Sequence, residues 1–465
     1  MAKKNMRIEK DSMGDVKVPN KAYYGAQTQR AIDNFTISQL QFPKSFICSL
    51  AIIKRSAAIV NYKLGKIDNK HSKAIIKACD EVLKGEFDSQ FKVDIFQTGS
   101  GTSSNMNINE VIANRASEIL GGELGSRKPV HPNDHVNLGQ SSNDVIPSAI
   151  HISVYNDISS RLLPSLIQLE KSLLNKKKEF RDIIKIGRTH LQDATPISLE
   201  QEFSGYHHQI KKSIIRIKNS HKPLLELALG GTAVGTGINT HKNFGEMIAS
   251  EISDYTEYDF TESKNHFESQ ATQDSIVELS GTLKTLSVSL HKIANDIRWL
   301  ASGPRSGIGE LVLPAVQPGS SIMPGKVNPV ICESLIQVCA KVIGNDSAIT
   351  IGGLGGFFEL NVMLPLIAYN TLESVELLSN AIIMFDEKLV MGLKANKEVC
   401  NNYIEGSLAM CTSLAPVIGY DKAAHIAHLA FQTGKTVREV AIELNILSKT
   451  ELDKLLDPKN MIKTE

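Results

Sequence analysis

The chain has 465 residues, which is too long for one hydrophobic core and is consistent with roughly two to four domains. Its 51 basic and 50 acidic residues leave a net charge of +1, which argues against a broad nucleic-acid-binding surface. Hydrophobic residues make up 42% and charged residues 22% of the chain, a composition that excludes a disordered protein. No run of about eighteen apolar residues occurs, so we expect no membrane-spanning helix.

The six cysteines form no CxxC pair. This spacing argues against a zinc ribbon, a locally ligated iron–sulfur cluster and a small disulfide scaffold. The first residues contain no apolar stretch, and Glu9 and Asp11 come too early for a transit peptide. We therefore expect a large cytoplasmic protein.

Strand-like alternation is scarce and is confined to short runs near the N-terminus, such as residues 16–18. An apolar stripe from 154 to 173 predicts a long helix, and Pro164 inside it should kink that helix. Isoleucines spaced at helical intervals predict a further helix over 210–217. These stripes are typical of core packing rather than of chemistry.

Residues 276–300 carry the clearest helical pattern. Small residues, among them Ser280, Ser287 and Ala294, flank its apolar seam, where a two-stranded coiled coil would carry Glu and Lys. They favour burial in a multi-helix bundle. The seam repeats at alternating spacings of three and four residues and consists of Ile276, Leu279, Leu283, Leu286, Leu290, Ile293, Ile297 and Leu300.

A last long helix is predicted from 361 to 378. Together the patterns predict an all-α fold built on a bundle of long helices. Long helices of this kind often complete their cores by association, so we expect a homo-oligomer.

Three stretches rich in Gly, Ser, Thr and Asn interrupt the helical pattern: QTGSGTSSNMN (97–107), QSSND (140–144) and PGSSIMPGKVNP (318–329). Their hydroxyls, amides and backbone N–H groups could converge on an anion such as a small carboxylate. Each could equally be a turn or a helix N-cap. The third is not a nucleotide phosphate-binding loop, because five residues separate Gly319 from Gly325 and Val327 follows Lys326.

The glycine-rich runs 230–237 and 351–356 lack the GxGxxG register, which argues against dinucleotide binding. His190 lies among polar residues in GRTHLQDATP (187–196) and is a candidate acid–base group. The two histidines of HPNDH (131–135) lie beside a proline without further ligands. We interpret that segment as a polar surface loop and predict no metal site.

GSSIMPGKVNP (319–329) resembles the signature of the fumarase/aspartase superfamily. The resemblance extends over nearly the whole chain, because YGAQTQR (24–30), the polar stretches, SGPRSGIGE (302–310), FELNV (358–362) and GYDKAAHIA (419–427) follow in the family's order. It is closest to class II fumarase, the metal-free type. Gly325 and Glu333 favour fumarase over aspartate ammonia-lyase, which usually has Ala at the first of these positions.

The resemblance implies an all-α fold of three domains. We expect an N-terminal domain over 1–140, a central long-helix domain over 141–393 that carries the GSSIMPGKVNP loop, and a small helical domain over 394–465. It further implies a homotetramer around a twenty-helix core, with each active site built from three subunits. The polar stretches would then meet between chains.

The implied activity is the reversible hydration of fumarate to L-malate, a step of the tricarboxylic acid cycle, without cofactor or metal. Ser320 would be the base that removes a proton from the carbon beside a carboxylate, and Lys326 would supply positive charge for the carbanion-like intermediate. His190, with Glu333, would handle the proton of the departing hydroxyl through water. We also expect Arg188 to contribute a local positive field toward dicarboxylates.

The resemblance implies further binding residues. Those expected at the two carboxylates are Ser100, Gly101, Thr102, Ser141, Ser142 and Asn143. Further substrate contacts are expected from Thr189, Ser321, Lys326, Val327 and Asn328. A second anion site would comprise His131, Pro132, Asn133 and Asp134.

One departure stands out: Leu138 and Gly139 occupy the positions where fumarases commonly have Lys-Ser. The loss of this positive charge predicts a raised KM with kcat less affected. Two alternatives stay open, an aspartate ammonia-lyase and a non-catalytic structural or binding descendant of the family. The five intact residues of the site argue against the second: Ser320, Lys326, Asn328, His190 and Glu333.

Overall fold

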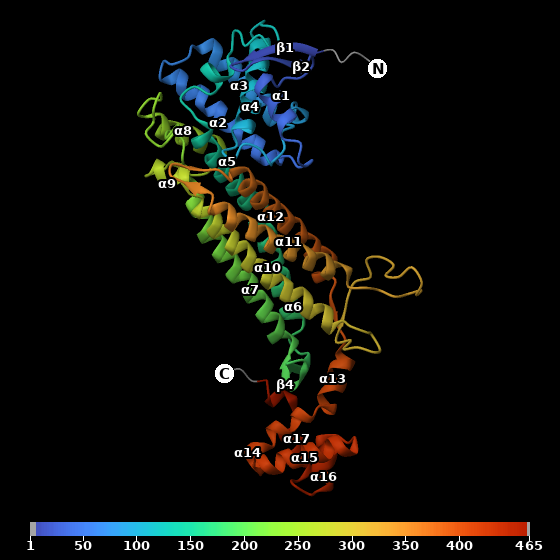
Figure 1. The fold of residues 1–465 in the computed structure, drawn as a ribbon. Coiled ribbons are helices and arrows are strands. Elements are labelled where there is room, and N and C mark those ends of the chain that lie inside the picture. Colours follow the sequence, from blue (N-terminus) through green and yellow to red (C-terminus); the bar gives the residue numbers. More distant parts are fainter. Residues whose placement is uncertain (1–5, 463–465) are drawn as a thin grey trace. The chain divides into compact units, whose positions relative to one another are not determined.

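The computed structural model describes residues 6–462 of the chain, and these are mainly helical, as predicted (Figure 1). They form two compact units, each assembled from three stretches of the sequence. The first unit contains 6–163, Arg216–Thr285 and Lys341–Leu378. The second contains Pro164–Ile215, Leu286–Ala340 and 379–462.

The first unit begins with a hairpin of strands β1 (Met6–Asp11) and β2 (Gly14–Pro19), in which Met6 pairs with Pro19. This confirms the strand predicted at 16–18. Helices α1 (Ala26–Asn34), α2 (Lys44–Lys63), α3 (Asn69–Leu83) and α4 (Thr102–Ile119) follow. α2 packs against α3, against α5 (Ser142–Asp157) and against α8 (Phe244–Thr256), and its apolar side chains form the middle of this unit.

The helix predicted over 154–173 is observed as α5, a π-helical turn (Ile158–Leu162) and α6 (Leu163–Glu179). Pro164 has no N–H to donate, and its ring crowds the carbonyl one turn earlier. The α-helical bonding pattern therefore loosens into a π turn directly before it, which is a common accommodation of an interrupted helix.

The remaining long helices are α7 (Leu199–His221), α10 (Asp274–Leu300), α11 (Val330–Gly353) and α12 (Leu364–Phe385). The whole apolar seam of α10 is buried, with no member more than 5% exposed. The small residues that flank it admit neighbouring helices. In the first unit Ser280 donates to Asp346 of α11 (2.8 Å), and in the second Tyr206 of α7 donates to Asp296 (3.1 Å). The bundle prediction is thus confirmed within each unit.

The second unit contains a hairpin that the sequence analysis missed. Strands β3 (Ile184–Thr189) and β4 (Gln192–Ser198) pair antiparallel, so the expectation that strands are confined to the N-terminus is wrong. The apolar–polar alternation in β3 covers only Ile184, Lys185 and Ile186 before Gly187, a run shorter than the four residues by which a strand is recognised. Ile184 and Ile186 pack into the core of the C-terminal helices.

Those C-terminal helices are α13 (Lys397–Gly406), α14 (Ala415–Ile418), α15 (Tyr420–Thr433), α16 (Val437–Glu443) and α17 (Lys449–Leu455). The short elements are α9 (His266–Ala271), the parallel pair β5 (Glu226–Leu227) and β6 (Thr261–Glu262), and the antiparallel pairs β7 (Leu311–Val312) with β10 (Lys394–Ala395) and β8 (Gly356–Phe357) with β9 (Leu360–Asn361). Short 3-10 helices occur at Asp88–Gln90, Lys222–Leu225, Leu408–Ser413 and Pro458–Asn460, and π turns also at Pro132–Val136 and Asp386–Val390.

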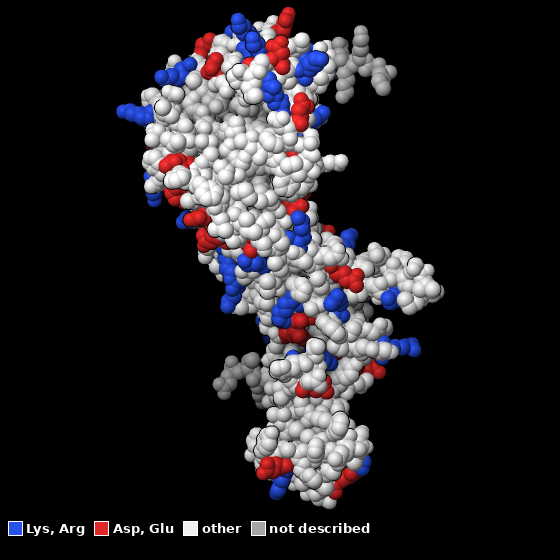
Figure 2. Space-filling model, viewed as in Figure 1, with Lys and Arg blue, Asp and Glu red and all other residues white. Residues whose placement is uncertain are grey.

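Acidic and basic side chains are interspersed on the face that Figure 2 shows, in keeping with the balanced composition. Within residues 6–462, none of the helices is both long enough and apolar enough to cross a membrane.

Candidate active site

The segment Ser100–Thr102 lies at the N-terminus of α4. Gly101 is the N-cap residue and has a φ of +72°, a conformation that favours glycine, and it supplies no side chain to cap the helix. The Ser100 and Thr102 hydroxyls are hydrogen-bonded to each other at 2.8 Å. The positive end of a helix is thus presented beside two hydroxyl groups, which is an arrangement suited to a carboxylate.

Close packing of glycines fixes this segment. A Cβ on Gly99 would lie 1.9 Å from the carbonyl oxygen of Val362, and Leu364 donates its N–H to the Gly99 carbonyl at 3.0 Å. A Cβ on Gly101 would lie 3.0 Å from Ile146 of α5. The QTGSGT and FELNV motifs therefore meet in the first unit, and the QTGSGT motif also lies against α5.

Ser141 and Asp144 form a capping box at the N-terminus of α5. The Ser141 hydroxyl accepts the Asn143 N–H (3.2 Å), and the Asp144 carboxylate accepts the Ser141 N–H (2.9 Å). The Asn143 side chain donates to the carbonyl of Ala233 (2.8 Å). The second predicted carboxylate-binding segment, Ser141–Asn143, thus stands at the N-terminus of a helix of the first unit, as the first segment does, and Gly101 of the first segment lies against Ile146 of the same helix.

The glycine-rich run at 230–237, which lacks the dinucleotide-binding register, lies beside Ser141. The buried Asp144 accepts the N–H groups of Gly230 (3.2 Å) and Thr232 (2.9 Å). A cavity of about 220 Å³ lies between this run and the loop before α5, with Gln140, Ser141, Thr232 and Asn239 in its wall. The glycine density of the run was the one signal that could have indicated such a close approach.

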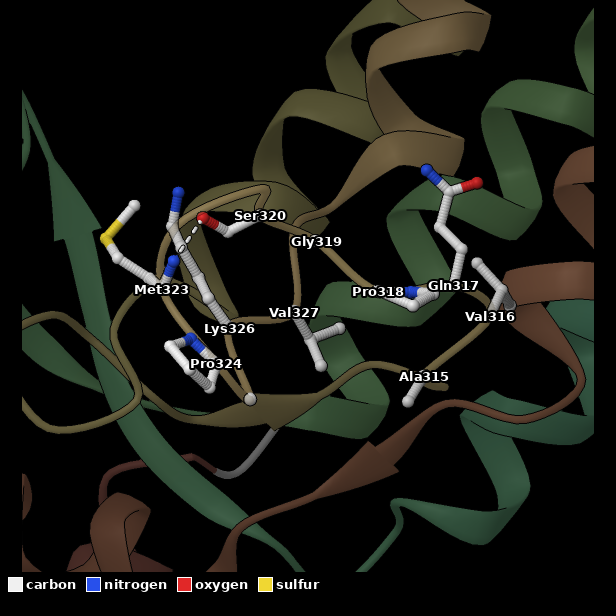
Figure 3. A pocket seen from close by; sticks show the side chains of 11 residues that line it. Ala315, Val316, Gln317, Pro318, Gly319, Ser320, Met323, Pro324, Lys326 and Val327 are labelled. Carbon is white, nitrogen blue, oxygen red and sulfur yellow. Dashed lines mark hydrogen bonds between the residues drawn. The ribbon is translucent and has the colours of Figure 1, made fainter.

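In the second unit, Ser320 lies in the long loop between β7 and α11. Its Oγ accepts two backbone N–H groups, from Ile322 at 3.2 Å and from Met323 at 2.9 Å. The loop is closed across its base, because Gly319 donates to the Lys326 carbonyl (2.8 Å) and the Asn328 side chain donates to the Gly319 carbonyl. It surrounds a cavity of about 490 Å³ (Figure 3).

The other predicted residues of this loop lie at its surface. In Figure 3 the Lys326 side chain extends toward the end of the loop where the Ser320 hydroxyl lies. Ser321 and Val327 are exposed, and Asn328 is half-buried. Glu333 lies in the first turn of α11, where a negative charge favours the helix. The loop residues thus present one hydroxyl and one ammonium group to an open cavity.

His190 and Leu191 form the two-residue turn of the β3–β4 hairpin, with φ of +56° and +59°. These values are those of a type I′ turn, which non-glycine residues adopt only with strain. The turn leaves His190 and the neighbouring Thr189 exposed. His190 thus lies at the tip of the hairpin and Glu333 in the first turn of α11, and within the described part of the chain the two side chains form no ion pair with each other.

Arg188 does not provide the free positive field that the sequence analysis expected. Its guanidinium donates to both oxygens of the fully buried Glu310, at 3.0 and 2.9 Å. Lys185, itself buried, lies 3.3 Å from the same carboxylate and 3.2 Å from Glu202. The expectation is wrong because the charge of Arg188 is already neutralised within the protein.

The predicted second anion site forms a single π turn, Pro132–Val136, at the surface. The His131 side chain caps it by accepting the N–H groups of Asn133 (3.3 Å) and Asp134 (3.2 Å). Asn133 and Asp134 are exposed, whereas Pro132 is buried. Across residues 6–462 there is no cluster of three or more His, Cys, Asp or Glu side chains with the arrangement of a metal site.

Comparison with known proteins shows the class to which this fold and these polar segments belong. The chain matches the family model described as lyase over residues 14–344 and that described as fumarase C C-terminus over 410–463, and it belongs to this lyase family.

Within the family, the chain is 52% identical to the class II fumarate hydratase of Wigglesworthia glossinidia brevipalpis, over 98% of both chains. It is likewise 52% identical to the mitochondrial fumarate hydratase of Homo sapiens, over 99% of this chain and 91% of that protein. Its structure is similar to that of a class II fumarase from Schistosoma mansoni, with a TM-score of 0.95 and 44% identity over 98% of this chain and 99% of the other.

Proposed function

We propose that this protein is a fumarate hydratase, which interconverts fumarate and L-malate. The observation that carries the proposal is the environment of Ser320, whose oxygen accepts two backbone N–H groups in a loop that also bears Lys326. A serine hydroxyl can act as a base only if its oxyanion is stabilised, and paired N–H donors with a nearby ammonium group do this. The identity to class II fumarate hydratases supports the same activity.

In the dehydration direction, Ser320 would remove the proton from the carbon beside one carboxylate of L-malate. The electron pair left behind spreads into that carboxylate, so negative charge grows on a group that is already anionic. Lys326, Asn328 and the loop N–H groups would stabilise that charge. His190, oriented by Glu333 across an interface between subunits, would then deliver a proton through water to the hydroxyl as it leaves.

The helix N-termini of the first unit would bind the substrate carboxylates. Ser100, Gly101 and Thr102 at α4 and Ser141, Ser142 and Asn143 at α5 offer hydroxyls, one amide and the positive ends of two helices. Thr189, Ser321 and Val327 would complete the walls of the site. His131, Pro132, Asn133 and Asp134 would form a separate anion site at the surface.

We further propose a homotetramer in which each site combines three subunits. Large apolar side chains are exposed along the long helices of a single chain, including Val288 on α10 (57%), Ile351 on α11 (61%) and Ile383 on α12 (38%). Such side chains on a bundle helix are typical of a surface that another copy covers. The proposed domains remain 1–140, 141–393 and 394–465, and sedimentation together with limited proteolysis would test both assignments.

A paired assay tests the activity. The absorbance of fumarate is followed after L-malate and L-aspartate are added separately to the purified protein. We expect fumarate from L-malate alone. Release from L-aspartate would instead show an aspartate ammonia-lyase, and release from neither would show a non-catalytic descendant. Because the proposed chemistry uses only protein groups, dialysis against a chelator should leave the malate activity unchanged.

A cytoplasmic location is also proposed. The six cysteines carry free thiols, four of them buried, which suits a reducing compartment. Since relatives described as mitochondrial share about the same identity as bacterial ones, cell fractionation is the test that decides the compartment.

A further inference from the structure

A buried lysine lies beneath the loop that leads into Ser141. Lys54 of α2 is fully buried, and its Nζ donates to Asn137 Oδ1 and Gln140 Oε1, at 2.9 Å each. An enclosed ammonium group is costly and is normally matched by a carboxylate in direct contact. Here both hydrogen-bond acceptors are neutral amides of a loop, so the lysine holds that loop at an energetic cost.

Asn137 joins this lysine to α4. Its Oδ1 also accepts the side-chain N–H groups of Asn105 (3.2 Å) and Asn109 (3.1 Å), and its Nδ2 donates to the Gln140 carbonyl (3.1 Å). One oxygen thus receives hydrogen bonds from α2 and from α4. The helix that begins at Thr102 and the loop that ends at Ser141 are therefore fastened to the same ammonium group.

The loop itself is short and closed. The Gln140 side chain donates back to the carbonyls of Val136 (3.1 Å) and Leu138 (3.2 Å). Asn61, two helical turns after Lys54 on α2, donates to the same Leu138 carbonyl (2.9 Å). Because the loop closes on itself, a shift at Asn137 or Gln140 would be passed on to Ser141 rather than absorbed.

We propose that Lys54 is a positioning residue for dicarboxylate binding, which fixes the spacing between the segments Ser100–Thr102 and Ser141–Asn143 and provides positive charge beneath them. This inference rests on the proposed function and deepens it. Lys54 touches no substrate in this arrangement. It acts through Asn137 and Gln140, and through an electric field that the protein interior screens less than water does.

The charge on Lys54 should titrate near neutral pH. Burial lowers the pKa of Lys54 to about 7, opposed by the charge of Asp144 on α5. The other titratable group that acts on it is the Cys79 thiol on α3, whose pKa is raised by burial, so that this group stays neutral. A lysine that loses its proton just above pH 7 would weaken dicarboxylate binding there.

Three variants of the full-length protein test the proposal: Lys54→Met, Lys54→Arg and Lys176→Met. Lys176 is the matched control, since it is a buried lysine of the second unit that donates to the Leu393 carbonyl and to Glu179. For each, kcat and KM for fumarate hydration are measured between about pH 6 and about pH 8.5, and the Kd for succinate is measured by calorimetry. Thermal unfolding reports whether each variant is folded.

For Lys54→Met we expect KM and the succinate Kd to rise about tenfold or more, because the buried hydrogen bonds donated by the ammonium group are lost. The kcat should stay within about threefold of the parent's value. In the parent, KM should rise as the pH increases through about 7. In Lys54→Arg this rise should disappear, since guanidinium stays protonated. Lys176→Met should lose stability with KM unchanged.

A folded Lys54→Met with the parent's KM and succinate Kd would overturn the proposal, as would the same pH dependence of KM in Lys54→Arg. If arginine is too large to fold at this position, Lys54→Gln replaces it, and its KM should be high at every pH. The succinate measurement distinguishes a failure of the role of Lys54 from a failure of the proposed function. A parent that hydrates no fumarate refutes the proposed function, whereas a loss of succinate affinity in Lys54→Met would still support the role of Lys54.

Discussion

Arg188 and Glu310 form a two-pronged ion pair, with both carboxylate oxygens within 3.0 Å of the guanidinium. The pair joins the motif that carries His190 to the motif SGPRSGIGE, more than a hundred residues later. Glu310 is fully buried, and its carbonyl also accepts the Asn396 N–H at 2.8 Å. The buried carboxylate of Glu310 therefore fixes the position of the β3–β4 hairpin and of His190 at its tip.

Replacing Arg188 by Lys should reduce kcat about tenfold to a hundredfold, because a single ammonium group cannot reproduce the two parallel bonds and the hairpin tip would shift. KM should change much less. Steady-state kinetics of fumarate hydration measure both constants. Arg305, exposed in the same SGPRSGIGE motif, provides the control, and Arg305→Lys should behave as the parent. An unchanged kcat in Arg188→Lys would show that the pair does not position His190.

Ser320→Ala should reduce kcat at least about a thousandfold, since it removes the proposed base while leaving Lys326 and the helix N-termini in place. The hydroxyl accepts hydrogen bonds only from loop N–H groups at the surface, so the unfolding temperature should hardly move. Single-turnover hydration and thermal unfolding are the measurements. Full activity in this variant would refute the assignment of the base.

The helical architecture was predictable because its signals are periodic. The α10 seam from Ile276 to Leu300 reads as a buried stripe, and all its members are buried. The β3–β4 hairpin was not predictable in this way, because the alternation in β3 ends after three residues and the turn residues His190 and Leu191 are neither glycine nor asparagine. The motif order indicated the family, yet only coordinates show that Arg188 is neutralised by Glu310, since partners so distant in sequence leave no local pattern.

Leu138→Lys should lower KM for fumarate about twofold to fivefold, since it returns a positive charge to the loop that precedes Ser141. The backbone carbonyl of Leu138 accepts hydrogen bonds from the side chains of Asn61 and Gln140. The side chain of Leu138 is half-exposed, so a longer side chain at this position can reach solvent. Kinetics at two salt concentrations measure the effect, which salt should weaken. Leu138→Met serves as the uncharged control, and an equal KM in the two variants would contradict the prediction.

The free energy of unfolding should rise with pH between about 7 and 9, opposite to the usual alkaline loss. Lys54 has a pKa of about 7 when folded and an ordinary value of 10.5, so the unfolded chain binds more protons in this window. This group alone contributes a rise of roughly 2 to 3 kcal/mol over that window. Above about pH 9 the buried thiols of Cys79, Cys332, Cys339 and Cys400 oppose it, because burial raises their pKa values and they lose their protons first in the unfolded chain. Urea unfolding followed by circular dichroism at fixed protein concentration measures the slope.

At lower pH two buried groups oppose each other. Burial raises the pKa of Asp144 to about 6 from 3.8, so the folded state binds more protons between these values and stability falls as the pH rises through them. Burial lowers the pKa of His151 to about 4 from 6.5, which gives the opposite slope over nearly the same range. The rise above pH 7 is therefore the test: it should vanish in Lys54→Met, whereas Lys176→Met should retain it. If the free energy of unfolding of Lys54→Met still rises above pH 7, a group other than Lys54 takes up a proton on unfolding, and the prediction is wrong.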